Sequence, residues 1–188
     1  MTASARGRAA SRGRPGTDTR SITERPTGGV RPTAYAAHVV TLRPLREDEY
    51  AAWDEAHRAE YERGLVEFAG MARDAARLKV ERDILAALPD GLATAGTWIW
   101  AVETDRRRVG TVFVGIRGGE AWLYDITIDP DERGKGFGRA AMVALESELR
   151  SLGHVTVTLN VWGGNVIARG LYTSLGYVEE SVHMRKRF

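Results

Sequence analysis

Hydrophobic residues in the middle of the chain occur in short runs that are rich in β-branched and aromatic side chains. Runs of this kind, bounded by turn residues, are typical of β-strands. The first two flank the polar turn at residues 104–108 and are expected to pair as antiparallel neighbours. We place three strands here, at residues 97–103, 109–118 and 120–130.

Three further strands are expected outside this block. Residues 39–43 form a short apolar run that Pro44 stops. Residues 155–162 alternate apolar with polar side chains, which is the period of a strand with one buried face. The C-terminal stretch at residues 177–188 is expected to form the last strand.

Helical spacing fills the segments between these strands. A long helical region begins at Asp48, breaks near residues 64–70 and ends at residues 89–91, where proline and glycine follow it. In the last part of this region, the apolar face of the helix is expected to carry Val80, Ile84, Leu85 and Leu88. A later helix is expected to bury Met142, Leu145, Leu149 and Leu152 and to end at Gly153. A short helix at residues 165–176 would turn Ala168, Leu171 and Leu175 inward.

The resulting order of elements is β, αα, βββ, α, β, α, β. Consecutive strands without a helix between them favour antiparallel pairing, and the single β–loop–α–β crossover adds one parallel pair. The pattern therefore predicts an α+β fold with a mixed, mostly antiparallel central sheet flanked by helices.

Composition narrows the class of protein. The chain has 188 residues, 43% of them hydrophobic, which suits one folded domain. It has no cysteine, which excludes disulfides, thiolate metal sites and a cysteine nucleophile. Neither a membrane-spanning run nor an apolar signal segment is visible, so we expect a cytoplasmic protein that does not associate with membranes.

Charge is distributed unevenly along the chain. Residues 1–33 contain seven arginines against two acidic residues, a formal charge of +5, so the remainder of this +2 chain carries −3. Residues 1–35 have few large apolar side chains and are expected to form a disordered, Arg/Gly-rich leader before a domain at residues 36–188. The alternative is an arm that binds nucleic acid through phosphate contacts, although no aromatic residues are interleaved for base stacking.

The stretch "DERGKGFGRAAM" at residues 131–142 carries the first functional signal. Glycines before a helix let backbone N–H groups approach a phosphate closely. A Walker A loop would need Ser or Thr after Gly134–Lys135, but Gly136 stands there. A dinucleotide loop would need an acidic residue at the end of the next strand, which offers only Asn160, and three strands precede the loop where a βαβ unit belongs.

A third kind of loop fits both the spacing and its setting. "RGKGFG" at residues 133–138 has the form [QR]-x-x-G-x-[GA], and "NVIARGLYTSLGYVEE" begins at residue 165. The two segments, together with "LRPLREDEY" and "WLYDITIDP", resemble the GNAT superfamily of acetyl-CoA-dependent N-acetyltransferases. The resemblance covers roughly residues 39–188 and implies a GNAT fold in which strand 4 splays from strand 5 and leaves a cofactor cleft.

The resemblance implies a binding site for acetyl-CoA as cosubstrate and no metal. Backbone from residue 133 to residue 139 would wrap the pyrophosphate at the start of a helix, where unpaired N–H groups and the helix dipole favour an anion. The main chain of strand 4 would bond to pantetheine, and Asn165 would lie near pantetheine or substrate. The expected cofactor-binding residues are Ile126, Thr127, Ile128, Arg133, Gly134, Lys135, Gly136, Phe137, Gly138, Arg139, Asn165 and Tyr172.

The resemblance also assigns the chemistry. A neutral amine would attack the thioester directly, a backbone N–H of strand 4 would stabilise the oxyanion, and Tyr172 would protonate the thiolate. Asp125 is the candidate general base, but regular alternation places it on the face opposite Trp122 and Tyr124 unless a bulge intervenes. Loss of the proton to water is the alternative. The four histidines lack metal-ligand spacing and are read as structural or exposed.

The acceptor is a small-molecule or peptide amine whose identity the sequence does not give. Carboxylates between residues 48 and 96 could attract a cationic amine, or they could form an ordinary solvated helix face. A non-catalytic acyl-CoA sensor and nucleic-acid association through the basic tail are the alternative functions. Members of the family often form homodimers.

Overall fold

The structure, a computed structural model, describes residues 38–105 and 107–186. The expected leader at residues 1–35 and the last two residues of the expected C-terminal strand lie outside the described residues. Five strands and four α-helices make up the described part, with short 3₁₀ turns at Gly91–Ala93 and Pro130–Glu132. The elements are β1 (Thr41–Pro44), α1 (Glu47–Glu67), α2 (Arg73–Ala87), β2 (Thr97–Thr104), β3 (Arg107–Arg117), β4 (Glu120–Ile128), α3 (Phe137–Ser151), β5 (Val157–Leu159) and α4 (Val166–Ser174).

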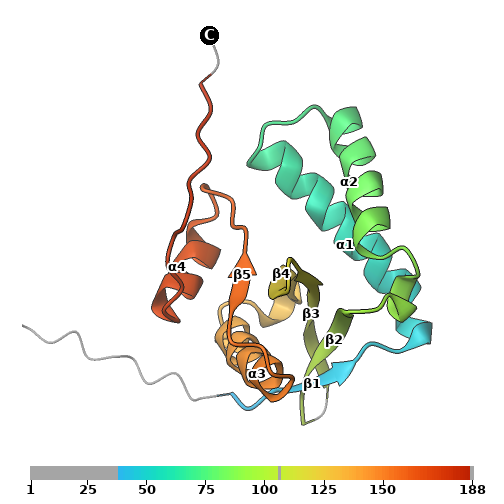
Figure 1. Cartoon of the computed structure of the whole chain (residues 1–188), viewed down its shortest axis with the longest axis vertical. Coiled ribbons are helices and arrows are strands. Elements are labelled where there is room, and N and C mark those ends of the chain that lie inside the picture. The colour runs from blue at the N-terminus through green and yellow to red at the C-terminus, as the bar shows by residue number, and fades with distance from the viewer. Residues whose placement is uncertain (1–37, 106, 187–188) are drawn as a thin grey trace, which may run out of the picture. The chain divides into compact units, whose positions relative to one another are not determined.

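The strands form one sheet in the order β1-β2-β3-β4-β5. Neighbours are antiparallel except β4 and β5, which are parallel because α3 crosses between them. Figure 1 shows α1 and α2 together on one side of the strands and α3 on the other. The predicted α+β fold with a mixed, mostly antiparallel sheet is confirmed.

Each face of the sheet has its own core. On the α3 face, Phe137, Met142, Leu145 and Leu149 pack against alternate side chains of β2, β3 and β4. On the other face, Trp53 of α1 packs with residues of β2, β3 and the end of α2. Residues two apart along a strand share a face, so the alternation read from the sequence supplies both cores.

The gap between β4 and β5 is the feature that positions the site. β5 pairs only with Ala121, Trp122 and Leu123 at the start of β4. Beyond Leu123, residues 124–128 of β4 have no partner strand on the β5 side among the described residues. The expected splay of strands 4 and 5 is therefore present.

Several expected details are wrong at the ends of elements. Leu85 is 67% exposed and Leu152 is 45% exposed, because the first lies beside the buried stripe of α2 and the second follows the last residue of α3. β1 begins at Thr41 and not at Val39, and it includes Pro44 as its last residue, paired with Trp100; an edge strand tolerates a residue without an N–H.

The C-terminal part of the prediction is also wrong. β5 has only three residues, and residues 177–186 form no strand. Their apolar side chains are largely exposed, with Val178 at 81% and Met184 at 87%. The segment buries little apolar surface, and β-propensity alone does not produce a ladder.

Candidate functional site

A β-bulge in β4 sets the direction of the key carboxylate. Val114 pairs with Leu123 and Phe113 pairs with Asp125, so Tyr124 is the extra residue between them. A bulge of this kind shifts the alternation by one position. Asp125 consequently lies on the same face as Phe113, toward α1. Regular alternation would place Asp125 opposite Trp122 and Tyr124, and the bulge, the exception left open above, brings it to the face of Phe113.

Space for the bulge comes from a glycine on the neighbouring strand. The ring of Tyr124 stacks on Phe113, with centroids 4.6 Å apart. A Cβ at Gly115 would lie 2.9 Å from Cε2 of Tyr124. A glycine at residue 115 therefore leaves room for the ring of Tyr124, the neighbour of Asp125 in β4.

Three polar side chains from two elements gather beyond the bulge: His57 of α1, and Asp125 and Thr127 of β4. We call them the β4 polar cluster. The hydroxyl of Thr127 donates to Oδ2 of Asp125 at 3.0 Å. Nδ1 of His57 lies 3.8 Å from the same oxygen. The side chain of Asp125 is 19% exposed, so its carboxylate is neither solvated freely nor sealed in the core.

Tyr172 has the protonation state that an acid needs. Burial, and secondly the negative charge of Asp125, raise the pKa of its hydroxyl to about 12. The hydroxyl is therefore protonated at neutral pH.

Backbone polar groups of β4 face the gap at alternate residues. The N–H of Asp129 donates to the carbonyl of Val109 on β3. Because backbone groups along a strand point to alternate sides, the N–H and C=O of Ile126 and Ile128 point away from β3. The N–H and C=O of Thr127 point toward β3. Of the three β4 residues expected to bind pantetheine, only Ile126 and Ile128 therefore offer backbone groups to a ligand.

The glycine loop lies at the end of the same gap. Gly134 and Gly136 have φ values of 74° and 91°, in the left-handed region, and Gly136 precedes the first residue of α3. A Cβ added at Gly134 would have no protein atom within 4 Å, so the loop is open on that side. The free N–H groups at the start of α3 and the positive end of its dipole make this a suitable place for a phosphate.

The basic side chains of the loop are held by neighbouring groups. Nε of Arg133 donates to the carbonyl of Ile128 at 2.9 Å, and Arg139 donates to Ser174 of α4. Nζ of Lys135 lies 3.3 Å from Glu132, which also binds Arg107. Arg107, and secondly Lys135, lower the pKa of Glu132 below its usual value. These contacts fix the loop backbone, and Arg133 ties it directly to β4.

The remaining expected residues have identifiable structural roles. Oδ1 of Asn165 accepts from the N–H of Ala168 at 3.1 Å and caps α4. Phe137 is 5% exposed and its ring packs in the α3 core, so only its backbone faces the loop. A Cβ at Gly138 would contact Leu171 of α4 at 3.5 Å. Whether Asn165 also contacts a ligand stays a prediction.

His57 lies beside Asp125, although its place in the sequence indicates only a structural or exposed histidine. Its ring is stacked on Trp53, and its Nδ1 lies 3.8 Å from Oδ2 of Asp125. The helical spacing of Trp53 and His57 places them on one face of α1, which is a signal in the sequence. The contact with Asp125 could not be read from it, because the bulge decides where that carboxylate points.

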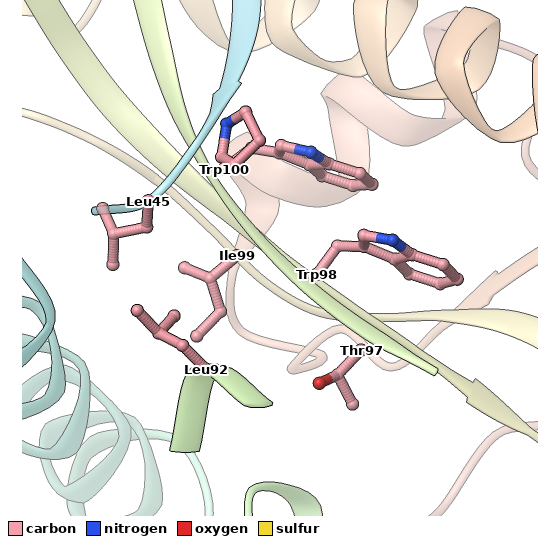
Figure 2. A pocket seen from close by; sticks show the side chains of 7 residues that line it. Leu45, Leu92, Thr97, Trp98, Ile99 and Trp100 are labelled. Carbon is pink, nitrogen blue, oxygen red and sulfur yellow. The ribbon is translucent and has the colours of Figure 1, made fainter. Parts of the chain in front are cut away.

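A cavity of about 120 Å³ lies elsewhere, at β1 and β2. Figure 2 shows Leu45, Leu92 and Ile99 on one side of β2 and the two indole rings of Trp98 and Trp100 on the other. It carries no acid–base group and belongs to the edge of the sheet opposite β5. We therefore assign the candidate site to the gap between β4 and β5.

Comparison with known proteins gives a family match. Residues 50–177 match the family described as "Acetyltransferase (GNAT) family". The uncharacterised N-acetyltransferase YycN of Bacillus subtilis is 27% identical over 153 residues, which cover 79% of this chain and 98% of YycN. The [ribosomal protein bS18]-alanine N-acetyltransferase of Escherichia coli is 41% identical over 63 residues, which cover 34% of this chain and 43% of that protein.

Solved structures agree with this match. The crystal structure of YycN superposes with a TM-score of 0.76 at 26% identity, covering 80% of this chain and 99% of YycN. An acetyltransferase structure from Pyrococcus furiosus has a TM-score of 0.60 at 20% identity, covers 79% of this chain and 99% of that chain, and shows the shared fold.

In residues 38–105 and 107–186, no three His, Cys, Asp or Glu side chains lie together as a metal site would require. No helix in that part of the chain is long and apolar enough to cross a membrane.

Proposed function

The chain belongs to the Acetyltransferase (GNAT) family, and from that premise we propose that it transfers the acetyl group of acetyl-CoA to a primary amine, with Tyr172 as the general acid. As an N-acetyltransferase it uses acetyl-CoA as cosubstrate. The observation that carries the proposal is the gap in the sheet: pairing of β4 with β5 stops at Leu123, next to an acid and a carboxylate.

The residues along the gap suit the parts of acetyl-CoA in order. The open glycine loop and the start of α3 would hold the pyrophosphate, with positive charge from the neighbouring basic side chains. The outward N–H and C=O of Ile126 and the outward N–H of Ile128, whose carbonyl accepts from Arg133, would bond to the amides of pantetheine as a neighbouring strand does. This order would bring the thioester to the bulge, beside Asp125 and Tyr172.

Tyr172 would act on the leaving group. When the bond between the acetyl carbon and sulfur breaks, the sulfur needs a proton, and a hydroxyl that is protonated at neutral pH can donate it. A backbone N–H at the bulge would stabilise the charge that develops on the carbonyl oxygen. Asp125 would face the incoming amine from the α1 side of the sheet.

The acceptor is proposed as a primary amine on a small molecule or a peptide. A carboxylate at the site favours a cationic acceptor. The relative from Escherichia coli acts on an alanine of a ribosomal protein, which makes a peptide amine one of the acceptors to try. Polyamines, aminoglycosides and lysine side chains are the others.

Two measurements, acetyl-CoA binding and then thiol release, test the proposed function. Calorimetric titration with acetyl-CoA, with ATP and NAD as controls, should show binding of acetyl-CoA alone. Thiol release should then be measured with spermidine, neomycin, a lysine-containing peptide and a peptide with an N-terminal alanine. Absence of acetyl-CoA binding would refute the proposal, and binding without thiol release from any amine would favour the sensor alternative.

A further inference from the structure

His57 carries a buried polar atom that the fold itself does not use. Its Nδ1 is buried and has no hydrogen-bond partner in the described part of the chain. Buried polar atoms in folded proteins are nearly always paired, so an unpaired one requires a reason. The side chain is 8% exposed and sits between aromatic neighbours, where water cannot satisfy it easily.

Packing fixes the plane of the His57 ring. The ring lies flat against Trp53, with centroids 5.0 Å apart and planes 7° apart. It meets Phe113 of β3 edge-on at 5.7 Å and 90°. With contacts on its face and its edge, the imidazole has little freedom to rotate, so the direction of Nδ1 is determined by the core.

Nδ1 is directed at the carboxylate of Asp125. The distance to Oδ2 is 3.8 Å, which is too long for a hydrogen bond, and a shift of about 1 Å would make one. Catalytic hydrogen bonds are often long in the free enzyme and shorten when substrates bind. Thr127 already donates to the same oxygen at 3.0 Å, so a second donor there would leave Oδ1 as the oxygen free to accept a proton.

We propose that His57 is a positioning residue for Asp125: its Nδ1–H closes onto Oδ2 when the substrates bind, and Asp125 then takes a proton from the acceptor ammonium. This inference rests on the proposed function. His57 itself does not touch the acceptor. Together with Thr127 it holds one oxygen of the carboxylate and aims the other at the amine.

The protons balance through one turnover. The ammonium gives one proton to Asp125, and the neutral nitrogen forms a bond to the acetyl carbon while the bond from that carbon to sulfur breaks. The sulfur takes the hydroxyl proton of Tyr172, and the second nitrogen proton restores that hydroxyl. Asp125 releases its proton to solvent, so the products are the amide, free thiol and one proton.

Three substitutions separate positioning from packing. His57→Asn keeps an N–H donor near the place of Nδ1, His57→Gln moves the donor toward the place of Nε2, and His57→Phe keeps the aromatic stack without any donor. With the best amine of the screen and saturating acetyl-CoA, His57→Phe should lower kcat about a hundredfold, the scale of a displaced catalytic group. His57→Asn should restore most of that loss and His57→Gln should not. Full activity of His57→Phe, or equal losses in Asn and Phe, would overturn the proposal.

A neutral nucleophile gives a second readout. Hydroxylamine is unprotonated at neutral pH and needs no base before it attacks. His57→Phe should therefore slow transfer to spermidine much more than transfer to hydroxylamine. Equal slowing with both nucleophiles would mean that His57 supports the structure of the site and not the removal of the proton.

The third readout does not depend on any acceptor. Long-range ¹H–¹⁵N spectra of the acetyl-CoA-bound protein report whether Nδ1 or Nε2 of His57 carries the proton, and the spectrum of His57→Phe assigns its signals among the four histidines. We expect the proton on Nδ1; a proton on Nε2 would refute the contact. If calorimetry shows no acetyl-CoA binding, the proposed function fails, whereas acetyl-CoA binding with the proton on Nε2 refutes the contact alone.

Discussion

The pKa of the Tyr172 hydroxyl is set by the groups that surround it. Burial, and secondly the charge of Asp125, raise its pKa to about 12, so it is a protonated donor throughout the neutral range. Tyr177 lies next to it, with ring centroids 5.7 Å apart, and burial raises the pKa of its hydroxyl too. The two phenols differ in their neighbours: Asp125 acts on Tyr172, whereas Glu146 of α3 acts on Tyr177.

This difference gives a matched pair of variants. Tyr172→Phe should lower kcat about a hundredfold, at the lower end of what a general acid contributes, and leave the Kd for acetyl-CoA nearly unchanged. Tyr177→Phe removes a neighbouring buried hydroxyl and should keep its turnover. Steady-state thiol release and calorimetry measure both quantities. Unchanged turnover in Tyr172→Phe, or similar losses in the two variants, would remove Tyr172 from its assigned role.

At the scale of elements, α3 has a left-handed glycine close to each end. Gly134 in the loop before it and Gly153 after it have φ values of 74° and 89°, and neither would bring an added Cβ within 4 Å of another protein atom. The backbone strain of an alanine is therefore comparable at the two positions. Only the first lies in the loop that is proposed to hold the pyrophosphate.

Gly134→Ala and Gly153→Ala should consequently separate stability from binding. Each should lower the free energy of unfolding by about 1 kcal/mol, the cost of a left-handed alanine. Gly134→Ala should also weaken acetyl-CoA binding, because its Cβ or a rearranged loop would stand where the phosphate approaches. Urea unfolding and calorimetry test the two effects, and equal affinities in both variants would contradict the placement of the pyrophosphate.

At the scale of the whole molecule, an ion cluster joins three elements at the start of the domain. Arg43 of β1 binds Glu49 of α1 and Glu103 of β2, with each pair at 2.9 Å. The guanidinium of Arg43 lowers the pKa of Glu49 to about 2, against the opposing effect of partial burial. The cluster fixes the start of α1, the helix that carries His57.

The stability from Glu49 should depend on pH. Its pKa is depressed in the folded chain, so the contribution is complete above the ordinary value of 4.5 and is lost as the pH falls toward 2. At pH 7, Glu49→Gln should cost about 1 kcal/mol, the scale of a partly exposed ion pair. The difference from wild type should shrink steadily below pH 4.5. Urea midpoints between pH 7 and pH 3 measure it, with the exposed Glu55→Gln as control; a difference that does not change with pH would contradict the ion pair.

Much of the fold could be predicted from local patterns. Alternating and helical spacing identified the strands of the sheet and its helices, because each element buries one face and the period of that face depends only on its own residues. The glycine loop could also be predicted, since left-handed φ values at Gly134 and Gly136 are a property of glycine itself. The prediction of a C-terminal strand was wrong because a strand also needs a surface to pack against. The apolar side chains of residues 177–186 are largely exposed.

The sequence by itself thus determined the elements, their order, the loop before α3 and the family they resemble, all of which rest on neighbouring residues. The tertiary structure decided the face on which Asp125 lies, the point at Leu123 where β4 and β5 separate, and the approach of His57 to that carboxylate. Each of these depends on register between strands or on packing of α1 against the sheet. Such contacts join residues far apart in the chain, and no local period encodes them.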